Sequence, residues 1–220
     1  MTLNSLRLGG RRGGYVACPI LAGILMLPLG RAAALDVGTV VATEGTVEIA
    51  RSRVTTPAAR NASIAIGDEL RTGSPGKTDL GFFDREVTTA VRGEEAAAIV
   101  NSLTIGENSL AVIDKYEFDP RGPLARFLLM RGRASALVGK TSAGYEIKTP
   151  TAVALATGTR FVVTYDPATD LTEVVSVSGR LRVSGLDGHE VWVSAREITS
   201  VAKTTVWDHV RRHLDPFYRG

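Results

Sequence analysis

Few residues of this chain combine the type and spacing that catalysis or metal binding requires. His209 and His213 are four residues apart, a spacing that would place two imidazoles on one helix face, as in zinc sites. Arg211 and Arg212 stand between them, and no Glu completes the H-E-x-x-H pattern of a metalloprotease. We interpret the pair as part of a polar helix face; the alternative is a metal site.

The remaining reactive side chains form no catalytic set. Cys18, the single cysteine, lies in an apolar run near the N-terminus, so no thiol nucleophile follows that run. Asp166, Asp170 and Glu173 flank one predicted turn but lack the ligand density of a calcium loop. Aromatic residues make up 6% of the chain and are scattered, which disfavours a stacking platform for a sugar or nucleic-acid chain. We predict no enzyme, no catalytic residue, no cofactor and no metal.

Residues 1–34 have the three-part layout of a secretory signal peptide. An arginine-rich segment (7–12) precedes an uncharged, mostly apolar run (15–29), and three alanines (32–34) follow. The apolar run is shorter than the roughly 20 residues of a typical spanning helix. We predict cleavage after Ala34 and a periplasmic or secreted protein. The alternative is an uncleaved N-terminal anchor, and only then do we expect contact with a membrane.

The net charge of +3 depends on this signal segment. Residues 1–34 contain four arginines and no acid, so the remainder has 22 basic against 23 acidic residues. The basic character therefore gives no support to nucleic-acid binding, and we predict no nucleic-acid partner. A local basic cluster remains, which could meet a polyanion or form a solvated sheet face. It consists of Arg121, Arg126, Arg131 and Arg133, with the last two expected on one strand face.

After the signal, short runs of Val, Ile, Leu and Thr alternate with Gly, Asn, Asp and Pro, a pattern typical of many strands and few helices. We predict an all-β domain over 35–203, with two packed sets of short antiparallel strands in a sandwich-like or stacked arrangement. The predicted strands are 38–43, 46–51, 78–83, 87–92, 109–113, 126–131, 134–138, 145–148, 152–156, 160–165, 172–177, 180–184, 190–194 and 197–202.

One short helix is predicted at the C-terminus, over 204–214, within a final segment 204–220. Thr205 is a suitable N-cap, and Pro216 would end the run. This helix could pack on the sheet as a lid or dock a partner. Its apolar face would consist of Val206, Trp207, Val210 and Leu214.

A weak internal repeat is present. Three segments share an apolar strand, then a glycine, then a second alternating strand, which predicts a strand that bends at the glycine and continues on a neighbouring edge. These segments are VVATEGTVEIA (40–50), FLLMRGRASALV (127–138) and VVSVSGRLRVS (174–184), with Gly45, Gly132 and Gly179 at the bends.

Several short motifs also follow one another in a fixed order between 37 and 185. They are the Gly45 segment (41–47), GDELRTG (67–73), LGFFD (80–84), GENSL (106–110), LMRG (129–132), TPTA (149–152), GTRF (158–161) and VSVSG (175–179). In this order they resemble the FecR family, the extracytoplasmic part of bacterial sensor-regulators. The resemblance implies structural roles for the matching residues, namely Gly45, Gly67, Asp68, Thr72, Asn108, Ser109, Gly132, Thr149, Pro150, Gly158, Thr159, Phe161 and Gly179.

The chain departs from the family pattern in two places. Segment 85–105 is longer than the tight turn that the family often has there, and it could confer specificity or be a neutral decoration. Only residues 1–14 precede the apolar run, whereas iron-uptake regulators of the family carry a cytoplasmic domain there that holds a sigma factor. We therefore do not expect an anti-sigma role for these residues.

The sequence predicts an exported, non-enzymatic module that binds an envelope protein or a cell-wall polymer and takes part in signal sensing or regulation. One alternative is a structural envelope protein that assembles with its own copies through strand edges. Another is a degenerate hydrolase-like β domain, which would require a concave pocket lined by a pair of acids.

Overall fold

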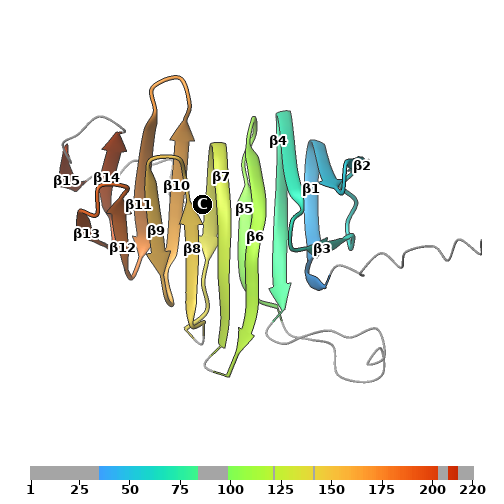
Figure 1. Ribbon diagram of the computed structural model, residues 1–220, viewed down its shortest axis with the longest axis horizontal. Coiled ribbons are helices and arrows are strands. Elements are labelled where there is room, and N and C mark those ends of the chain that lie inside the picture. The colour runs from blue at the N-terminus through green and yellow to red at the C-terminus, as the bar shows by residue number, and fades with distance from the viewer. Residues whose placement is uncertain (1–34, 84–98, 121, 141, 203–207, 213–220) are drawn as a thin grey trace, which may run out of the picture. The chain divides into compact units, whose positions relative to one another are not determined.

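The computed structural model describes residues 35–83, 99–120, 122–140, 142–202 and 208–212. They belong to the second of two compact units, which begins at Ala34. The strands form one continuous fifteen-stranded hydrogen-bonded sheet (Figure 1). They are β1 (Asp36–Arg51), β2 (Val54–Pro57), β3 (Ser63–Ala65), β4 (Glu69–Phe83), β5 (Ile99–Ile105), β6 (Leu110–Asp119), β7 (Gly122–Leu137), β8 (Gly144–Lys148), β9 (Ala152–Ala156), β10 (Arg160–Asp166), β11 (Leu171–Ser178), β12 (Arg180–Gly185), β13 (Glu190–Ser194), β14 (Glu197–Ala202) and β15 (Asp208–Arg212).

The sheet is arranged in two layers because its long strands pass from one layer to the other. In the first layer the order is β13, β12, β9, β8, the first half of β7, β6, the first half of β4, the second half of β1, and β2. In the second layer it is β15, β14, β11, β10, the second half of β7, β5, the second half of β4, the first half of β1, and β3. All pairs are antiparallel except β7 with β8.

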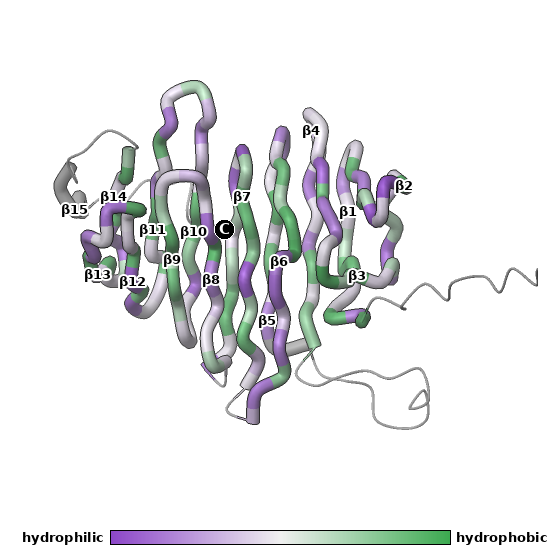
Figure 2. The backbone as a smooth tube through the Cα atoms, in the orientation of Figure 1, coloured by the Kyte–Doolittle hydropathy of each residue, from purple (hydrophilic) through white to green (hydrophobic). Residues whose placement is uncertain are grey.

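The two layers enclose a single core. Phe82 of the second layer packs against two aromatic rings of the first, with ring centroids 5.0 Å from Phe127 and 6.5 Å from Tyr145. All three side chains are almost fully buried. Hydrophobic and hydrophilic residues alternate along many of the strands in Figure 2, as expected when one face of each strand meets the core. The predicted all-β fold of packed strand sets is confirmed.

The alternation changes phase where a strand changes layer. In β7 the buried positions are odd-numbered up to Leu129 and even-numbered from Ala134. Between them lies Gly132, with a φ of 85° that L side chains rarely adopt. Gly45 and Gly179, with φ of 65° and 77°, lie at the same kind of crossing, within β1 and between β11 and β12. The predicted bends at the three repeat glycines are confirmed.

The predicted C-terminal helix is not seen where the structure describes the segment. Asp208–Arg212 forms strand β15, which pairs antiparallel with β14, whereas 203–207 and 213–220 lie outside the described residues. The open edge of β14 offers backbone partners to the chain, and the periodicity of a short apolar segment cannot reveal such a partner.

Besides β15, three strands were absent from the prediction. β2 and β3 have only four and three residues, and β5 occupies the end of segment 85–105, where it pairs with both β4 and β7. The predicted strand 87–92 and the predicted signal segment lie outside the described residues. Over the ranges that the structure does describe, no helix has the length and hydrophobicity needed to cross a bilayer.

The crossing at Gly132 predicts a specific sensitivity to added volume. A Cβ on Gly132 would lie 2.2 Å from Ser109 Oγ and 2.7 Å from Ser109 Cα. Because both backbone strain and a backbone clash must be relieved, we expect Gly132→Ala to lower the free energy of unfolding by roughly 2–4 kcal/mol.

Gly188→Ala is the matched control for this variant. Gly188 also has a positive φ, of 84°, but no atom lies within 4 Å of its would-be Cβ. Only the backbone cost of about 1–2 kcal/mol should remain. Urea unfolding of both variants checks the prediction, and equal losses would contradict the close approach to Ser109.

Candidate functional site

The reactive residues singled out from the sequence do not converge where the structure describes them. No group of three or more His, Cys, Asp or Glu side chains that could hold a metal occurs among the described residues. Asp166 accepts hydrogen bonds within its own turn, from the Ala168 amide and the Thr169 hydroxyl, both at 2.9 Å. Asp170 accepts one from Tyr165 at 2.8 Å, which raises the pKa of that tyrosine. Cys18 and the side chains of His209 and His213 lie outside the described part of the structure.

Among the family-motif residues, Asp68 makes the strongest polar contacts. Its carboxylate is fully buried and accepts hydrogen bonds from Nε and Nη2 of Arg51, both at 2.6 Å, and from the Ala65 amide at 2.9 Å. The hydrogen bond to Asp68 raises the pKa of Arg51. Gly67, with a φ of 87°, forms the turn that presents this carboxylate. The arrangement fixes the entry to β4 on the end of β1.

A second group of motif residues lies at the crossing of β7. Thr72 Oγ1 donates to the Gly106 carbonyl at 2.6 Å and accepts from the Ser109 amide at 2.8 Å. Ser109 Oγ in turn accepts from the Arg133 amide at 2.9 Å and donates to the Glu107 carbonyl at 3.0 Å. These two buried hydroxyls bond backbone groups where the strands leave their regular pairing. Their role is therefore to supply hydrogen bonds to the backbone at the point where β7 changes layer.

Asn108 lies in the same turn as Ser109. Its backbone has a φ of 52°, a conformation that asparagine tolerates better than most residues. Its amide donates to the Gly73 carbonyl at 3.0 Å, which ties the β5–β6 turn to the middle of β4. Gly45 faces the same part of β4, because a Cβ there would lie 2.1 Å from the Pro75 carbonyl oxygen.

The TPTA motif forms a buried hydroxyl cluster between the layers. Thr149 and Thr151 lie on either side of Pro150, in the turn between β8 and β9 of the first layer. Their hydroxyls lie 2.7 and 2.6 Å from the hydroxyl of Thr172, which belongs to β11 of the second layer. All three threonines are at most 3% exposed. The turn is therefore connected to the opposite layer.

The GTRF motif makes the next crossing, from β9 to β10. Gly158 has a φ of 64°, and Thr159 is buried with its hydroxyl donating to the Thr157 carbonyl at 3.2 Å. The methyl group of Thr159 lies 2.8 Å from where a Cβ on Gly179 would be, so this pair repeats the contact of Ser109 with Gly132. Phe161 is fully buried in the core.

The motif residues thus do not form one site but occupy successive turns and crossings. Sequence reasoning missed Arg51 and Thr172, which are partners of motif residues from distant strands. A lone arginine at a strand end and a threonine in a strand carry no motif signal by themselves.

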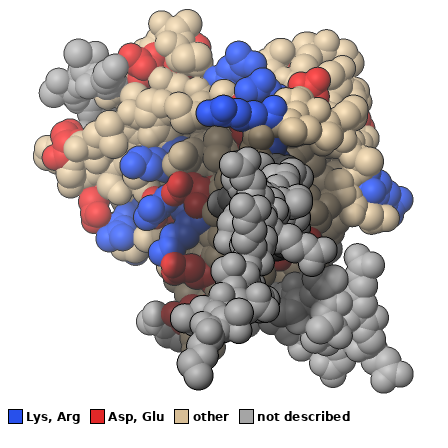
Figure 3. Space-filling model, turned by 45° about the vertical axis from the view of Figure 1, so that its right-hand side comes forward, with Lys and Arg blue, Asp and Glu red and all other residues tan. Residues whose placement is uncertain are grey.

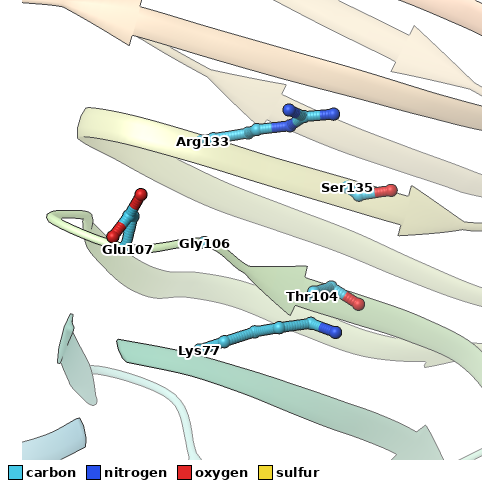
Figure 4. Close-up of a pocket in the computed structure, with 6 residues that line it drawn as sticks. All are labelled: Lys77, Thr104, Gly106, Glu107, Arg133 and Ser135. Carbon is cyan, nitrogen blue, oxygen red and sulfur yellow. The ribbon is translucent and has the colours of Figure 1, made fainter. Parts of the chain in front are cut away.

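A polar pocket of about 350 Å³ lies on the outer face of the second layer (Figure 4). Lys77, Gly106 and Arg133 occupy one cross-strand row over β4, the end of β5, and β7, since their neighbours pair in register and the Gly106 amide donates to the Arg133 carbonyl at 2.8 Å. The middle residue has no side chain, so two cationic side chains flank a glycine floor. Thr104 and Ser135 pair in the next row, and Glu107 lines the end of the pocket.

The pocket provides cations, hydroxyls and one carboxylate. This set suits a polar ligand with anionic groups and hydroxyls, because Lys and Arg donate to carboxylate or phosphate oxygens. Glu107 also accepts from Ser74 Oγ at 3.0 Å, and Asp79 beside the pocket accepts from Thr104 Oγ1 at 2.5 Å. Only one of the lining residues is an acid, so the pocket does not match the acid pair that a hydrolase-like domain would require.

The basic cluster predicted from the sequence is divided. Arg126 pairs with Glu146, with Nε and Oε1 2.8 Å apart, and lies 3.7 Å from Asp114; the hydrogen bond to Glu146 raises the pKa of Arg126. The prediction that Arg131 and Arg133 share one strand face is wrong, because the chain changes layer at Gly132 between them. Figure 3 shows acidic and basic side chains intermixed over part of one face, with a group of basic side chains elsewhere on it.

The family model described as FecR protein matches residues 68–182, just over half of the chain. The chain belongs to the FecR family. The predicted resemblance is confirmed, and the match runs from the buried Asp68 to the first-layer strand β12. Family membership supports a role in the regulation of a signal.

Two solved structures of a proposed anti-sigma factor from Parabacteroides distasonis ATCC 8503 are similar to this FecR-family chain. The structure at 1.65 Å resolution has a TM-score of 0.46 and 13% identity, and the match covers 66% of this chain and 60% of the other. The structure at 2.50 Å has a TM-score of 0.41 and 12% identity, with 62% and 61% covered. The match therefore spans about three fifths of the length of those chains. No curated protein matches the chain.

The ion pair of the buried Asp68 with the partly exposed Arg51 gives a prediction on stability. Asp68→Asn keeps the size of the side chain but leaves Arg51 without its charged partner. We expect a loss of roughly 1–3 kcal/mol in the free energy of unfolding, because buried Asp68 loses charge-assisted hydrogen bonds while solvent still reaches Arg51. The adjacent pair of Glu69 with Arg71 is half-exposed, so Glu69→Gln should change stability by less than about 0.5 kcal/mol. Thermal or urea unfolding measures both, and a similar small effect of the two substitutions would contradict the role assigned to Asp68.

Proposed function

We propose that this chain is an exported, non-enzymatic FecR-family module that binds an envelope protein or a cell-wall polymer and takes part in signal sensing. The observation that carries the proposal is the family match over residues 68–182, which includes the crossing at Gly132 and the pocket beside it. A module of this kind would regulate by binding a partner and not by catalysing a reaction. The motif residues agree with this, because their side chains bond the backbone and form no catalytic set.

Export is supported by the position of the first strand. The compact unit begins at Ala34 and β1 at Asp36, so cleavage after Ala34 would remove no described strand. The arginine-rich start, the apolar run and the three alanines of residues 1–34 supply the signals for such a cleavage. A mature chain would start at Leu35 in the periplasm or outside the cell.

The polar pocket is the binding site that we propose for this function. It opens on the outer face of the second layer, and its rows of cations and hydroxyls come from β4, β5 and β7. Those strands are fixed by the Thr72–Ser109 hydroxyls directly below the glycine floor, so the lining is held by rigid elements. Cell-wall polymers and acidic protein segments both present carboxylates and hydroxyl or amide groups, which this lining can bond.

Self-assembly through strand edges receives less support. At one end of the two layers the edge strands β2 and β3 have only 4 and 3 residues. Short edge strands are a common means of preventing edge-to-edge association. A constant mass across a protein concentration series would agree with the binding module, and a rising mass with self-assembly.

The test uses the mature protein with isolated cell-wall sacculi and, separately, with extracted envelope proteins. We expect the wild type to be retained on one of the two, which also identifies the class of partner. The double substitution Lys77→Ala with Arg133→Ala should weaken that binding by about tenfold or more, because each lost charge-assisted hydrogen bond is worth roughly 1.5–3 kcal/mol.

The control for this test is Lys115→Ala with Arg182→Ala, which removes two partly exposed cations from the outer face of the first layer. It should leave binding unchanged. Failure of the wild type to bind either preparation would contradict the proposed function. Equal binding by the wild type and the pocket variant would show that the binding site is not this pocket.

A further inference from the structure

The charged side chains of the polar pocket are separated along it. Lys77 and Arg133 lie in one cross-strand row on either side of Gly106. Neighbouring strands are about 4.8 Å apart, so the backbones that carry the two cations are roughly 10 Å apart. In Figure 4 both cationic side chains extend from this row toward the next one, which Thr104 and Ser135 occupy. One end of the pocket therefore combines two cations with two hydroxyls.

The opposite end of the pocket is acidic. Glu107 follows Gly106 directly along the chain, and Figure 4 shows its carboxylate on the side of the glycine away from Thr104. Among the described residues only Ser74 donates to this carboxylate, to Oε2 at 3.0 Å. Thr104 and Glu107 are three positions apart, so at most about 11 Å of backbone separates the hydroxyl row from the acid. A ligand that fills the pocket can therefore reach the cations with one end and Oε1 of Glu107 with the other.

The charges around the pocket are balanced. Asp79, beside the pocket, accepts a hydrogen bond from the Thr104 hydroxyl at 2.5 Å. The two acids, Asp79 and Glu107, are equal in number to the two cations, Lys77 and Arg133. A polyanion is attracted by the two cations but repelled by the two acids. A ligand with one charge of each sign instead meets an opposite charge at each end of the pocket.

The size and polarity of the pocket narrow the class of ligand further. The volume of about 350 Å³ is near the lower limit of ligand pockets, which hold roughly 300–1,000 Å³, so it suits one small residue and not a long chain segment. A neutral sugar unit of similar size could bond the hydroxyls but would leave the charged groups without a charged partner. Hydrogen bonds between charged groups are about twice as strong as neutral ones, so a ligand that carries both charges fits this lining better.

We propose that the pocket recognises a zwitterionic residue, with its carboxylate between Lys77 and Arg133 and its ammonium on Glu107. This inference rests on the proposed function, because it names the chemistry that the partner presents at the same site. A diamino acid has a suitable length, since a carboxylate and an ammonium lie at opposite ends of its carbon chain. Glu107 is then the residue that determines specificity, because it selects such a residue over polymers that carry carboxylates or phosphates alone.

The test compares three small probes with related carbon chains. Diaminopimelate carries ammonium and carboxylate groups, pimelate carries only the carboxylates, and cadaverine carries only the ammonium groups. Heteronuclear NMR titration of the mature protein measures the affinities, and a shift of the Gly106 amide signal locates each probe. We expect the wild type to bind diaminopimelate at least about tenfold more tightly than either of the others, because each of those leaves one end of the pocket unpaired.

Substitutions at the two ends of the pocket should act on different probes. Glu107→Gln keeps the size of the side chain and can still accept from Ser74, so it should reduce the preference for diaminopimelate over pimelate to about twofold or less. Lys77→Ala should weaken the binding of both probes by a similar factor, about tenfold, and leave their ratio unchanged. Glu117→Gln is the matched control, because it removes one exposed acid from the first layer, and it should leave all three affinities unchanged.

Three results would overturn the inference. They are equal affinities of the wild type for diaminopimelate and pimelate, a preference that persists in Glu107→Gln, and no shift of the Gly106 signal with diaminopimelate. The proposed function would still stand in these cases if the Lys77 and Arg133 double variant loses its retention on sacculi or envelope proteins. The proposed function fails by a different result, equal retention of the wild type and that double variant, so the two failures are distinguishable.

Discussion

The close contact between Ser109 and Gly132 shows the constraint on which the whole structure depends. A strand that passes from one layer to the other must shift its side-chain alternation by one residue, and it must do so without leaving backbone groups unpaired in the interior. Gly132 permits the shift because no Cβ separates it from the neighbouring turn. Ser109 completes it by accepting a hydrogen bond from the Arg133 amide, which follows directly.

This constraint explains why glycines and hydroxyl residues are frequent among the motif residues. Two crossings pair a left-handed glycine with a hydroxyl residue, Gly132 with Ser109 and Gly179 with Thr159, whereas Gly45 approaches the backbone of Pro75. The same crossing also holds Gly106 in place, because the Thr72 hydroxyl donates a hydrogen bond to its carbonyl. The glycine floor of the polar pocket is therefore a by-product of a crossing, and the cations beside it lie on strands that the crossing fixes.

The sequence indicates where strands bend at glycines, but not which distant residues bond to the motif side chains. Gly45, Gly132 and Gly179 could be recognised because each follows an apolar strand and precedes a second, alternating one. The pairing of Arg51 with Asp68 joins residues 17 apart, and that of Thr149 with Thr172 joins residues 23 apart, and neither pair shares a periodic pattern. β15 was predicted as a helix because its pairing depends on the open edge of β14, which local propensity does not reveal. The pocket draws on three strands and could not be read from any one of them.

The physical unit extends beyond the region that matches the family. β1 pairs with β4 along both layers, and its Val37, Val40 and Ile49 are part of the single core. At the other end, β14 pairs with β11 and contributes the buried Val201. A chain limited to residues 68–182 would expose the edges of β4 and β11 and lose part of the core that the crossings enclose. The matched region therefore marks where the motifs are dense, whereas the unit that must fold together runs from β1 to at least β14.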